Sequence, residues 1–229
     1  MKSKKVGKPS VGPIKLRNGK LTGNPNEMCN EIAHAFGSVF SNFVPTIPAP
    51  YQEFQGNFSM NEISIVDVHR ALGNLNPNSA LGPDGVHPRL LKECSSELTL
   101  PLYLIFNLSV TEKCLPAKWK PSSVTPLFKK GCRSDPLNYR PISLTSIPCK
   151  VLERLIAVRL LNYLEENSIL SSRQFGFRPG RSTLDQLILT YEQISSWLNE
   201  GSNCDIILFD FSKAFDVVSH IILLENSII

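Results

Sequence analysis

The stretch IILFDFSKAFD, residues 206–216, is the strongest indication of the fold in this sequence. Its apolar, branched opening predicts a buried strand that ends at Asp210. A carboxylate at the end of such a strand is unfavourable unless it is paired or coordinates a cation. We therefore expect Asp210, together with the backbone carbonyl of Phe211, to contribute to a divalent metal site beside a nucleotide.

Two residues of this stretch have a second interpretation that the residues alone leave open. Asp210 precedes a short helix-compatible run, so its side chain could simply cap a helix, which is the commoner arrangement for an isolated aspartate. Phe215 could be a core residue. Alternatively, its ring could press on the sugar of a bound nucleotide and exclude a 2′-hydroxyl group.

The positive charge of the chain is concentrated in two places. The net charge is only +4, but the first twenty residues hold seven lysines and arginines and no acid. Residues 113–181 hold thirteen basic and four acidic residues. Such a basic block favours a phosphate-bearing partner, although an ordinary lysine-rich surface would look the same by charge alone.

Cysteine usage and hydropathy exclude several classes of protein. The six cysteines are scattered, with no C-x-x-C pair, so neither a zinc site nor a disulfide framework is expected. The sequence does not begin with a secretory signal, and its apolar runs are shorter than the ~20 residues that span a bilayer. We expect an intracellular chain, nuclear or cytoplasmic, with no membrane partner.

The pattern of apolar residues predicts an α+β chain in two parts. Residues 1–57 are expected to form a flexible basic lead-in and connector with one helix, over 27–43, and residues 58–229 the main domain. Further helices are predicted at 65–75 after a capping Ser64, from about Pro88, and at 98–110, 150–165 and 183–199, the last capped by Thr183 and closed by Gly201. A short strand is predicted at 124–128.

Two further segments carry residues suited to phosphates. Lys129 and Lys130 follow the short strand, and Arg140 lies in the run NYRPISL, residues 138–144. The run QFGFRPGRST, residues 174–183, interleaves glycine, aromatic residues and arginines, including Arg178 and Arg181, just before a helix. Arginine binds phosphate through its planar fork of donors, and glycine lets a backbone approach a ligand. Each segment could equally be an ordinary charged turn.

Five ordered stretches together resemble the amino-terminal part of the reverse transcriptase of non-long-terminal-repeat (LINE-like) retrotransposons. They are ALGPDG at 80–85, VTPLFKKG at 124–131, NYRPISL at 138–144, QFGFRPGRST at 174–183 and FDFSKAFD at 209–216. The resemblance covers about residues 60–220. It implies the fingers and the first palm strand of a right-hand polymerase, incomplete, and RNA-templated DNA synthesis with Mg²⁺ in the complete family.

The resemblance also assigns roles to individual residues. Asp210 matches a catalytic metal-binding aspartate, with Phe211 beside it, and Phe215 the residue that screens the sugar. Lys129, Lys130 and Arg140 fall in the segment that contacts the deoxynucleoside triphosphate. Arg178 and Arg181 fall in the segment that handles nucleic acid. The implied partners are an RNA template, a DNA primer and deoxynucleoside triphosphates.

The sequence departs from the family where further carboxylates are expected. Thirteen residues follow Asp216, and the family's later palm segments with two further aspartates are not among them. We therefore expect the 229-residue chain to be inactive alone. The alternatives are a nucleic-acid-binding remnant without catalysis and a reverse transcriptase of the group II intron type, which shares the GFRPGRS run.

Overall fold

The computed structural model describes residues 11–38, 58, 63–211, 214 and 218–219. Within these residues the fold mixes helices with two antiparallel strand pairs, as an α+β protein does. The elements are β1 (Ile14–Lys15), β2 (Leu21–Thr22), α1 (Pro25–Gly37), α2 (Ile65–Gly73), α3 (Pro88–Glu93), α4 (Ser95–Thr111), η1 (Ala117–Trp119), β3 (Ser123–Phe128), η2 (Pro136–Asn138), β4 (Tyr139–Leu144), α5 (Ile147–Glu166) and α6 (Thr183–Asn199).

The main core lies where α2, α3, α4 and the start of α5 meet. Apolar residues at helical spacing, such as Val68 and Leu72 of α2, point into it and are fully buried. Phe106 of α4 and Leu152 of α5 complete its centre. Each such side chain contributes about 1.5–3 kcal/mol relative to exposure. The sequence predicted these four helices correctly; the starts at Ile65 and Pro88 match, and the other predicted boundaries differ by one to three residues.

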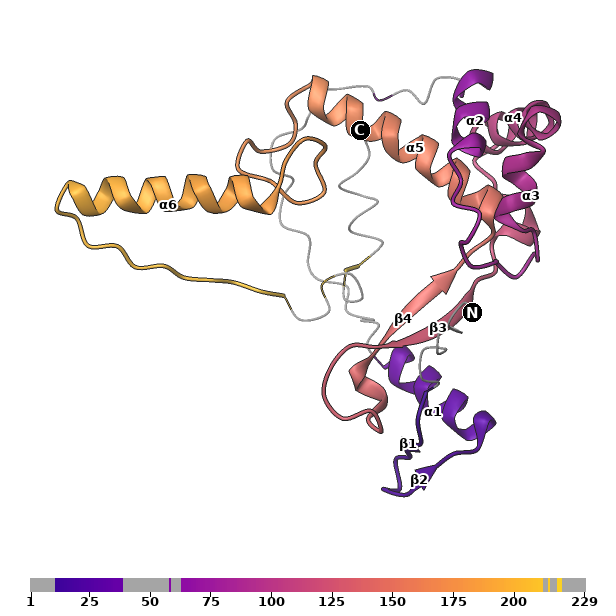
Figure 1. The fold of residues 1–229 in the computed structure, drawn as a ribbon, viewed down its shortest axis with the longest axis horizontal. Helices are drawn as coiled ribbons and strands as arrows, with labels where there is room; N and C mark the ends of the chain where they lie inside the picture. The colour runs from indigo at the N-terminus through magenta and orange to yellow at the C-terminus, as the bar shows by residue number, and fades with distance from the viewer. Residues whose placement is uncertain (1–10, 39–57, 59–62, 212–213, 215–217, 220–229) are drawn as a thin grey trace, which may run out of the picture.

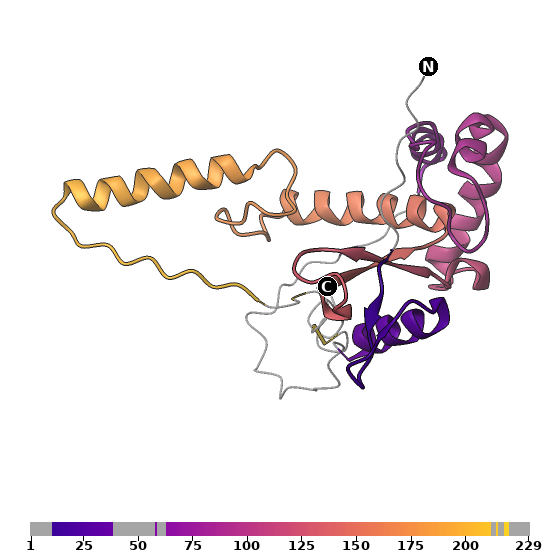
Figure 2. The same ribbon diagram turned by 60° about the horizontal axis from the view of Figure 1, so that its bottom comes forward.

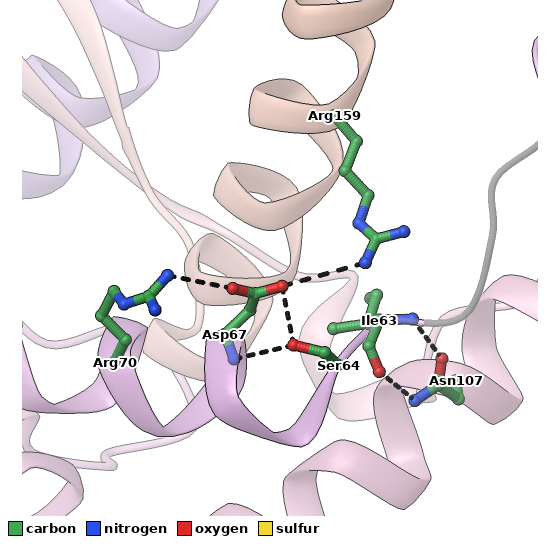
Figure 3. A network of polar contacts seen from close by, with 6 residues as sticks. All are labelled: Ile63, Ser64, Asp67, Arg70, Asn107 and Arg159. Atoms are coloured by element: carbon green, nitrogen blue, oxygen red, sulfur yellow. Dashed lines mark hydrogen bonds and ion pairs between the residues drawn. The ribbon is translucent and has the colours of Figure 1, made fainter.

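Polar contacts fix the beginning of α2 against its neighbours (Figure 3). The Ser64 hydroxyl accepts the backbone N–H of Asp67 at 3.1 Å, which confirms the predicted cap. The Asp67 carboxylate also pairs with Arg70 at 3.1 Å and with Arg159 of α5 at 3.8 Å. The Asn107 side chain of α4 bonds both backbone groups of Ile63. One turn of chain is thereby tied to two helices.

Gly82 lies in the turn between α2 and α3 and packs against the corner between β4 and α5. A Cβ atom at this position would lie 2.5 Å from the carbonyl oxygen of Thr145 and 2.7 Å from the Cα of Ser146. Ser146 is fully buried and caps α5. Only a residue without a side chain fits here. The turn is therefore a packing contact with this corner.

The strands β3 and β4 form a hairpin that leads into this corner. Their register pairs Phe128 with Tyr139 and Leu127 with Arg140. Residues 11–38 pack against the far end of the hairpin, where Ile14, Ile32 and Tyr139 form a second buried cluster. We had expected residues 11–26 to be flexible; the structure instead gives them the short β1–β2 pair and the start of α1. Long-range burial of Ile14 orders them.

Two helices expose apolar residues that their helical periodicity would place inward. In α4 the exposed residues include Leu100, Leu104 and Leu108, so only one face of this helix is buried. In α6 the predicted inward face is exposed, with Leu187 at 66% and Tyr191 at 73%. Periodicity identified the apolar face of α6 correctly, but among the described residues nothing buries it.

The predicted buried strand at 206–210 was wrong. Residues 202–211 lie outside any helix or strand, and Leu208 and Phe209 are 90% and 87% exposed. A strand needs a neighbour for its backbone N–H and C=O groups, and the described residues offer this segment none. The first helix ends at Gly37, where Ser38 is its C-cap, so the predicted extent to residue 43 was wrong. The boundary at 57 lies outside the described residues and stays a prediction.

The hairpin and α5 diverge from their shared corner (Figure 1). Beyond α5 a loop leads to α6, which projects away from the rest of the described chain in both views (Figures 1 and 2). The extended segment after α6 runs back toward the hairpin side. No helix in the described part of the chain is both long and apolar enough to cross a membrane.

Replacing Gly82 with alanine should destabilise the chain by about 1–3 kcal/mol, because the added methyl group meets backbone atoms that cannot move aside. Urea denaturation followed by circular dichroism measures this. The matched control is Gly73→Ala in α2, where a Cβ meets nothing within 4 Å and should be neutral or slightly stabilising. Equal stability of the two variants would contradict the packing role of Gly82.

Candidate nucleotide and nucleic-acid interface

The far end of the β3–β4 hairpin, residues 128–140, presents basic side chains on one face; we name these residues the hairpin tip. Side chains alternate between the two faces of a strand. Phe128 and Tyr139 therefore share the face packed against residues 11–38, while Arg140 and its partner Leu127 share the opposite, exposed face. Lys129 follows Phe128 and continues the exposed face. Strand register thus places Lys129 and Arg140 at neighbouring positions on this face, and their role toward a triphosphate stays a prediction.

Contacts within the hairpin tip hold its connection in one conformation. The Tyr139 hydroxyl donates to the Arg133 carbonyl at 2.6 Å, and the Arg133 guanidinium lies 4.5 Å from the centre of the Phe128 ring. The backbone N–H of Lys129 donates to the Asn138 carbonyl at 2.9 Å. Lys130 remains exposed beside the turn. The backbone beneath the lysines is therefore well defined.

A loop between α5 and α6, residues 171–181, carries the predicted nucleic-acid arginines; we name it the arginine loop. Arg178 is held within the protein: its Nε donates to Glu165 of α5 at 2.7 Å and its Nη1 to the Ser171 carbonyl at 2.6 Å. A second bond to Glu165 makes the pair bidentate. With only 8% of its side chain exposed, Arg178 positions the loop.

This ion pair shifts both titrations in the expected directions. The hydrogen bond from Arg178 lowers the pKa of Glu165, and the bond to Glu165 raises the pKa of Arg178. Because the pKa of Glu165 is lowered, the pair stabilises the loop at every pH above the usual carboxyl range. That stabilisation is lost as the pH falls through the lowered value.

Arg181 has a different environment from Arg178. It is exposed, and its guanidinium carbon lies 5.2 Å from the centre of the buried Phe175 ring, a cation–π arrangement. The next residue, Ser182, caps α6 through a reciprocal capping box with Asp185. The cap is thus Ser182 and not the predicted Thr183. Arg181 remains the candidate of the pair for contact with nucleic acid.

A hollow of about 680 Å³ lies between the arginine loop, α6 and the extended segment. Its walls include Arg173 and Phe175 from the loop, Trp197 from α6, and Ile206 and Ile207 from the segment. All residues that line the hollow lie between 172 and 207 in the sequence. No sequence motif predicted this hollow.

The predicted metal-binding residues do not form a cluster with other metal ligands in the described part of the chain. Asp210 and Phe211 belong to the exposed extended segment, and Phe215 lies outside the described residues. Among the described residues, no group of three or more His, Cys, Asp or Glu side chains could hold a metal ion. A single exposed carboxylate does not meet the ligand demands of Mg²⁺. The described residues therefore do not form a magnesium site by themselves.

Sequence reasoning missed the residues that position the candidate ligands. In the sequence nothing distinguishes Glu165 from the adjacent Glu166, although in the structure only Glu165 pairs with Arg178 and Glu166 is exposed. Tyr139 looked like part of a motif, although it is the buried anchor of the hairpin tip. The strongest available signal was strand alternation, which places Tyr139 opposite the face of Arg140.

Comparison with known proteins places these segments in one family. The family described as "Reverse transcriptase (RNA-dependent DNA polymerase)" matches residues 128–227. The "Probable RNA-directed DNA polymerase from transposon BS" of Drosophila melanogaster is 31% identical over 91% of this chain and 24% of its own length. The corresponding protein of transposon X-element, from the same fly, is 33% identical over 74% of this chain and 19% of its own length.

Another relative is the RNA-directed DNA polymerase from mobile element jockey of the same fly, 29% identical over 73% of this chain. The chain spans about a quarter or less of the length of these curated relatives. Their names confirm the retrotransposon lineage that the five motifs predicted, in preference to the group II intron alternative.

The cysteines should differ widely in reactivity. Hydrogen bonding to Ser134 lowers the pKa of the exposed Cys132 in the hairpin tip, whereas burial beside Glu153 raises the pKa of Cys149 to about 11. At pH 8 iodoacetamide should alkylate Cys132 at least about tenfold faster than Cys149, because the thiolate is the nucleophile. Peptide mass spectrometry measures both rates, and exposed Cys114 reports reagent access. Equal rates would contradict the described environments.

Glu165→Gln should loosen the arginine loop, because it removes the charged partner of Arg178. Limited trypsin digestion at pH 8 should then cleave after Arg173 and Arg181 several-fold faster than in the unmodified chain. The matched control is Glu166→Gln, one residue away and exposed, which should leave both rates unchanged. Equally slow cleavage in the two variants would show that the ion pair does not hold the loop.

Proposed function

The chain belongs to the reverse transcriptase family of non-long-terminal-repeat retrotransposons, and we propose that it forms the fingers and the beginning of the palm of an RNA-directed DNA polymerase. The observation that supports this proposal is the exposed face of the hairpin tip, where the strand register places Arg140 and Lys129 at neighbouring positions. This face falls at the start of the region that matches the family.

The hairpin tip binds the triphosphate of the incoming deoxynucleotide. Arg140 supplies a planar fork for two phosphate oxygens, and Lys129 adds a second positive charge on the same face. Lys130 extends this charge at the turn. Because none of these three residues has an ion pair with a carboxylate among the described contacts, their charge is available to a ligand.

The arginine loop handles the backbone of the template strand. Arg178 and Glu165 hold the loop in shape, and the exposed Arg181 offers its guanidinium to a phosphate. The excess of basic over acidic residues across 113–181 supports an RNA template and a DNA primer as the partners.

In the complete enzyme, the extended segment 206–211 is a palm strand that carries Asp210. Support comes from its apolar side chains and from the exposed apolar face of α6, which are surfaces of the kind that a neighbouring sheet covers. Phe215 would screen the sugar of the nucleotide. Mg²⁺ is the expected cofactor of the family, but the described residues do not complete its site, so we assign no catalytic step to it.

The 229-residue chain should bind nucleotide without polymerising it. Photolabelling with 8-azido-dATP should modify the chain, and Arg140→Ala should reduce labelling about tenfold, since charge-assisted bonds are worth about 1.5–3 kcal/mol. The matched control is Arg154→Ala on the exposed surface of α5. Equal labelling of the two variants would contradict the role of Arg140. DNA synthesis by the chain on a primed RNA template with Mg²⁺ would contradict its inactivity.

A non-catalytic nucleic-acid-binding role is the second candidate, and the basic block favours it. It requires RNA binding, measured by fluorescence anisotropy, that falls steeply between 50 and 300 mM salt, by ~10³-fold if about six phosphates are contacted. Strong RNA binding without nucleotide labelling would favour this candidate over the first. Binding that ignores salt would exclude it.

A further inference from the structure

The N-terminal segment, residues 11–38, is a folded unit joined to the hairpin tip. Figures 1 and 2 show α1 beside the end of the hairpin in both views. Ile14 is fully buried there, and it forms the second core cluster with Ile32 of α1 and Tyr139 of β4. Ile14 and Ile32 lie more than a hundred positions before Tyr139 in the sequence.

A backbone bond joins the same two regions. The N–H of Lys15 donates to the carbonyl of Ser134 at 2.7 Å, so the connection of the hairpin bonds to β1. Within the N-terminal segment, the Asn24 side chain caps α1 by accepting the N–H of Asn26, and Arg17 pairs with Glu31 at 3.5 Å. The N-terminal segment therefore has internal contacts that hold its structure where it packs against the hairpin.

This packing reaches only one face of the hairpin tip. Strand alternation puts Phe128 and Tyr139 against the N-terminal segment and leaves Arg140 on the opposite, exposed face. An isolated two-stranded hairpin is marginally stable in water. Burial of Phe128 and Tyr139 therefore supplies stability that the strand pair lacks by itself.

We propose that the N-terminal segment is a positioning element for nucleotide binding: by packing behind the hairpin tip it fixes the geometry in which Lys129 and Arg140 face the triphosphate. This inference rests on the proposed function of the hairpin tip. It predicts that residues without any contact to nucleotide, Ile14 above all, control nucleotide affinity.

The experiment compares Ile14→Asp and the milder Ile14→Ala with a matched control, Leu21→Asp. Leu21 lies in the adjacent strand β2 but is 64% exposed, so a charge there leaves the packing intact. Hydrogen exchange of the 229-residue chain is followed by mass spectrometry for peptides covering 128–140 and 147–155. The second peptide spans the start of α5, which belongs to the main core, and reports whether the chain still folds.

We expect exchange at 128–140 to rise at least about tenfold in Ile14→Asp, less in Ile14→Ala, and not at all in Leu21→Asp, with 147–155 unchanged throughout. Labelling by 8-azido-dATP should fall in the same order. If 147–155 also loses protection in Ile14→Asp, the comparison passes to Ile14→Ala.

Three outcomes would overturn the inference, each in its own way. Unchanged exchange at 128–140 in both Ile14 variants would show that the N-terminal segment does not stabilise the hairpin tip. Faster exchange with unchanged labelling would show that this stability does not serve nucleotide binding. Absence of labelling in the unmodified chain would remove the proposed function itself, while the exchange data would still score the packing separately.

Discussion

Gly82 lies against the backbone of Thr145 and Ser146, at the corner where β4 ends and α5 begins. The two elements that carry the candidate binding residues start from this corner. The hairpin leads to Lys129 and Arg140, and α5 leads to the arginine loop. Because a Cβ atom at residue 82 would lie only 2.5 Å from the Thr145 carbonyl oxygen, the α2–α3 turn packs against this corner only if residue 82 has no side chain. The buried cap Ser146 then begins α5 at that point.

Helices were predictable from the sequence because their signals are local. Ser64 marked a helix start through its side-chain cap, Pro88 through its fixed backbone, and Gly201 marked a helix end through its positive φ. Each of these predictions was confirmed. The strand at 206–210 failed for the converse reason. Its apolar residues are local, but a strand exists only with a neighbour that supplies backbone partners, and no described residues do so. The same distinction explains α6, whose helical period was evident and whose burial was not.

The contacts that shape the candidate site join residues far apart in sequence. Lys15 meets Ser134, and Ile14 meets Tyr139, yet neither pair shares a pattern that composition or spacing could reveal. Residues 11–26 looked flexible because they carry glycine, proline, lysine and asparagine with no apolar period. The buried Ile14 and the bond from Lys15 to Ser134 nevertheless join them to the hairpin. Motifs found the hairpin and the arginine loop. The elements that hold each of them in place had to be read from the structure.

Arg178 and Arg181 show most directly what a motif leaves undecided. They stand three residues apart in one run, and the resemblance gave both the same role. A guanidinium satisfies its donors with whichever acceptors lie nearest. Glu165 of α5 lies beside Arg178, whereas the Phe175 ring of the loop itself lies beside Arg181. Arg178 therefore donates to acceptors within the protein, whereas Arg181 is exposed and is the candidate for contact with a ligand. Removing the carboxylate of Glu165 would therefore free a second cation in the loop but take away the bond that orders it.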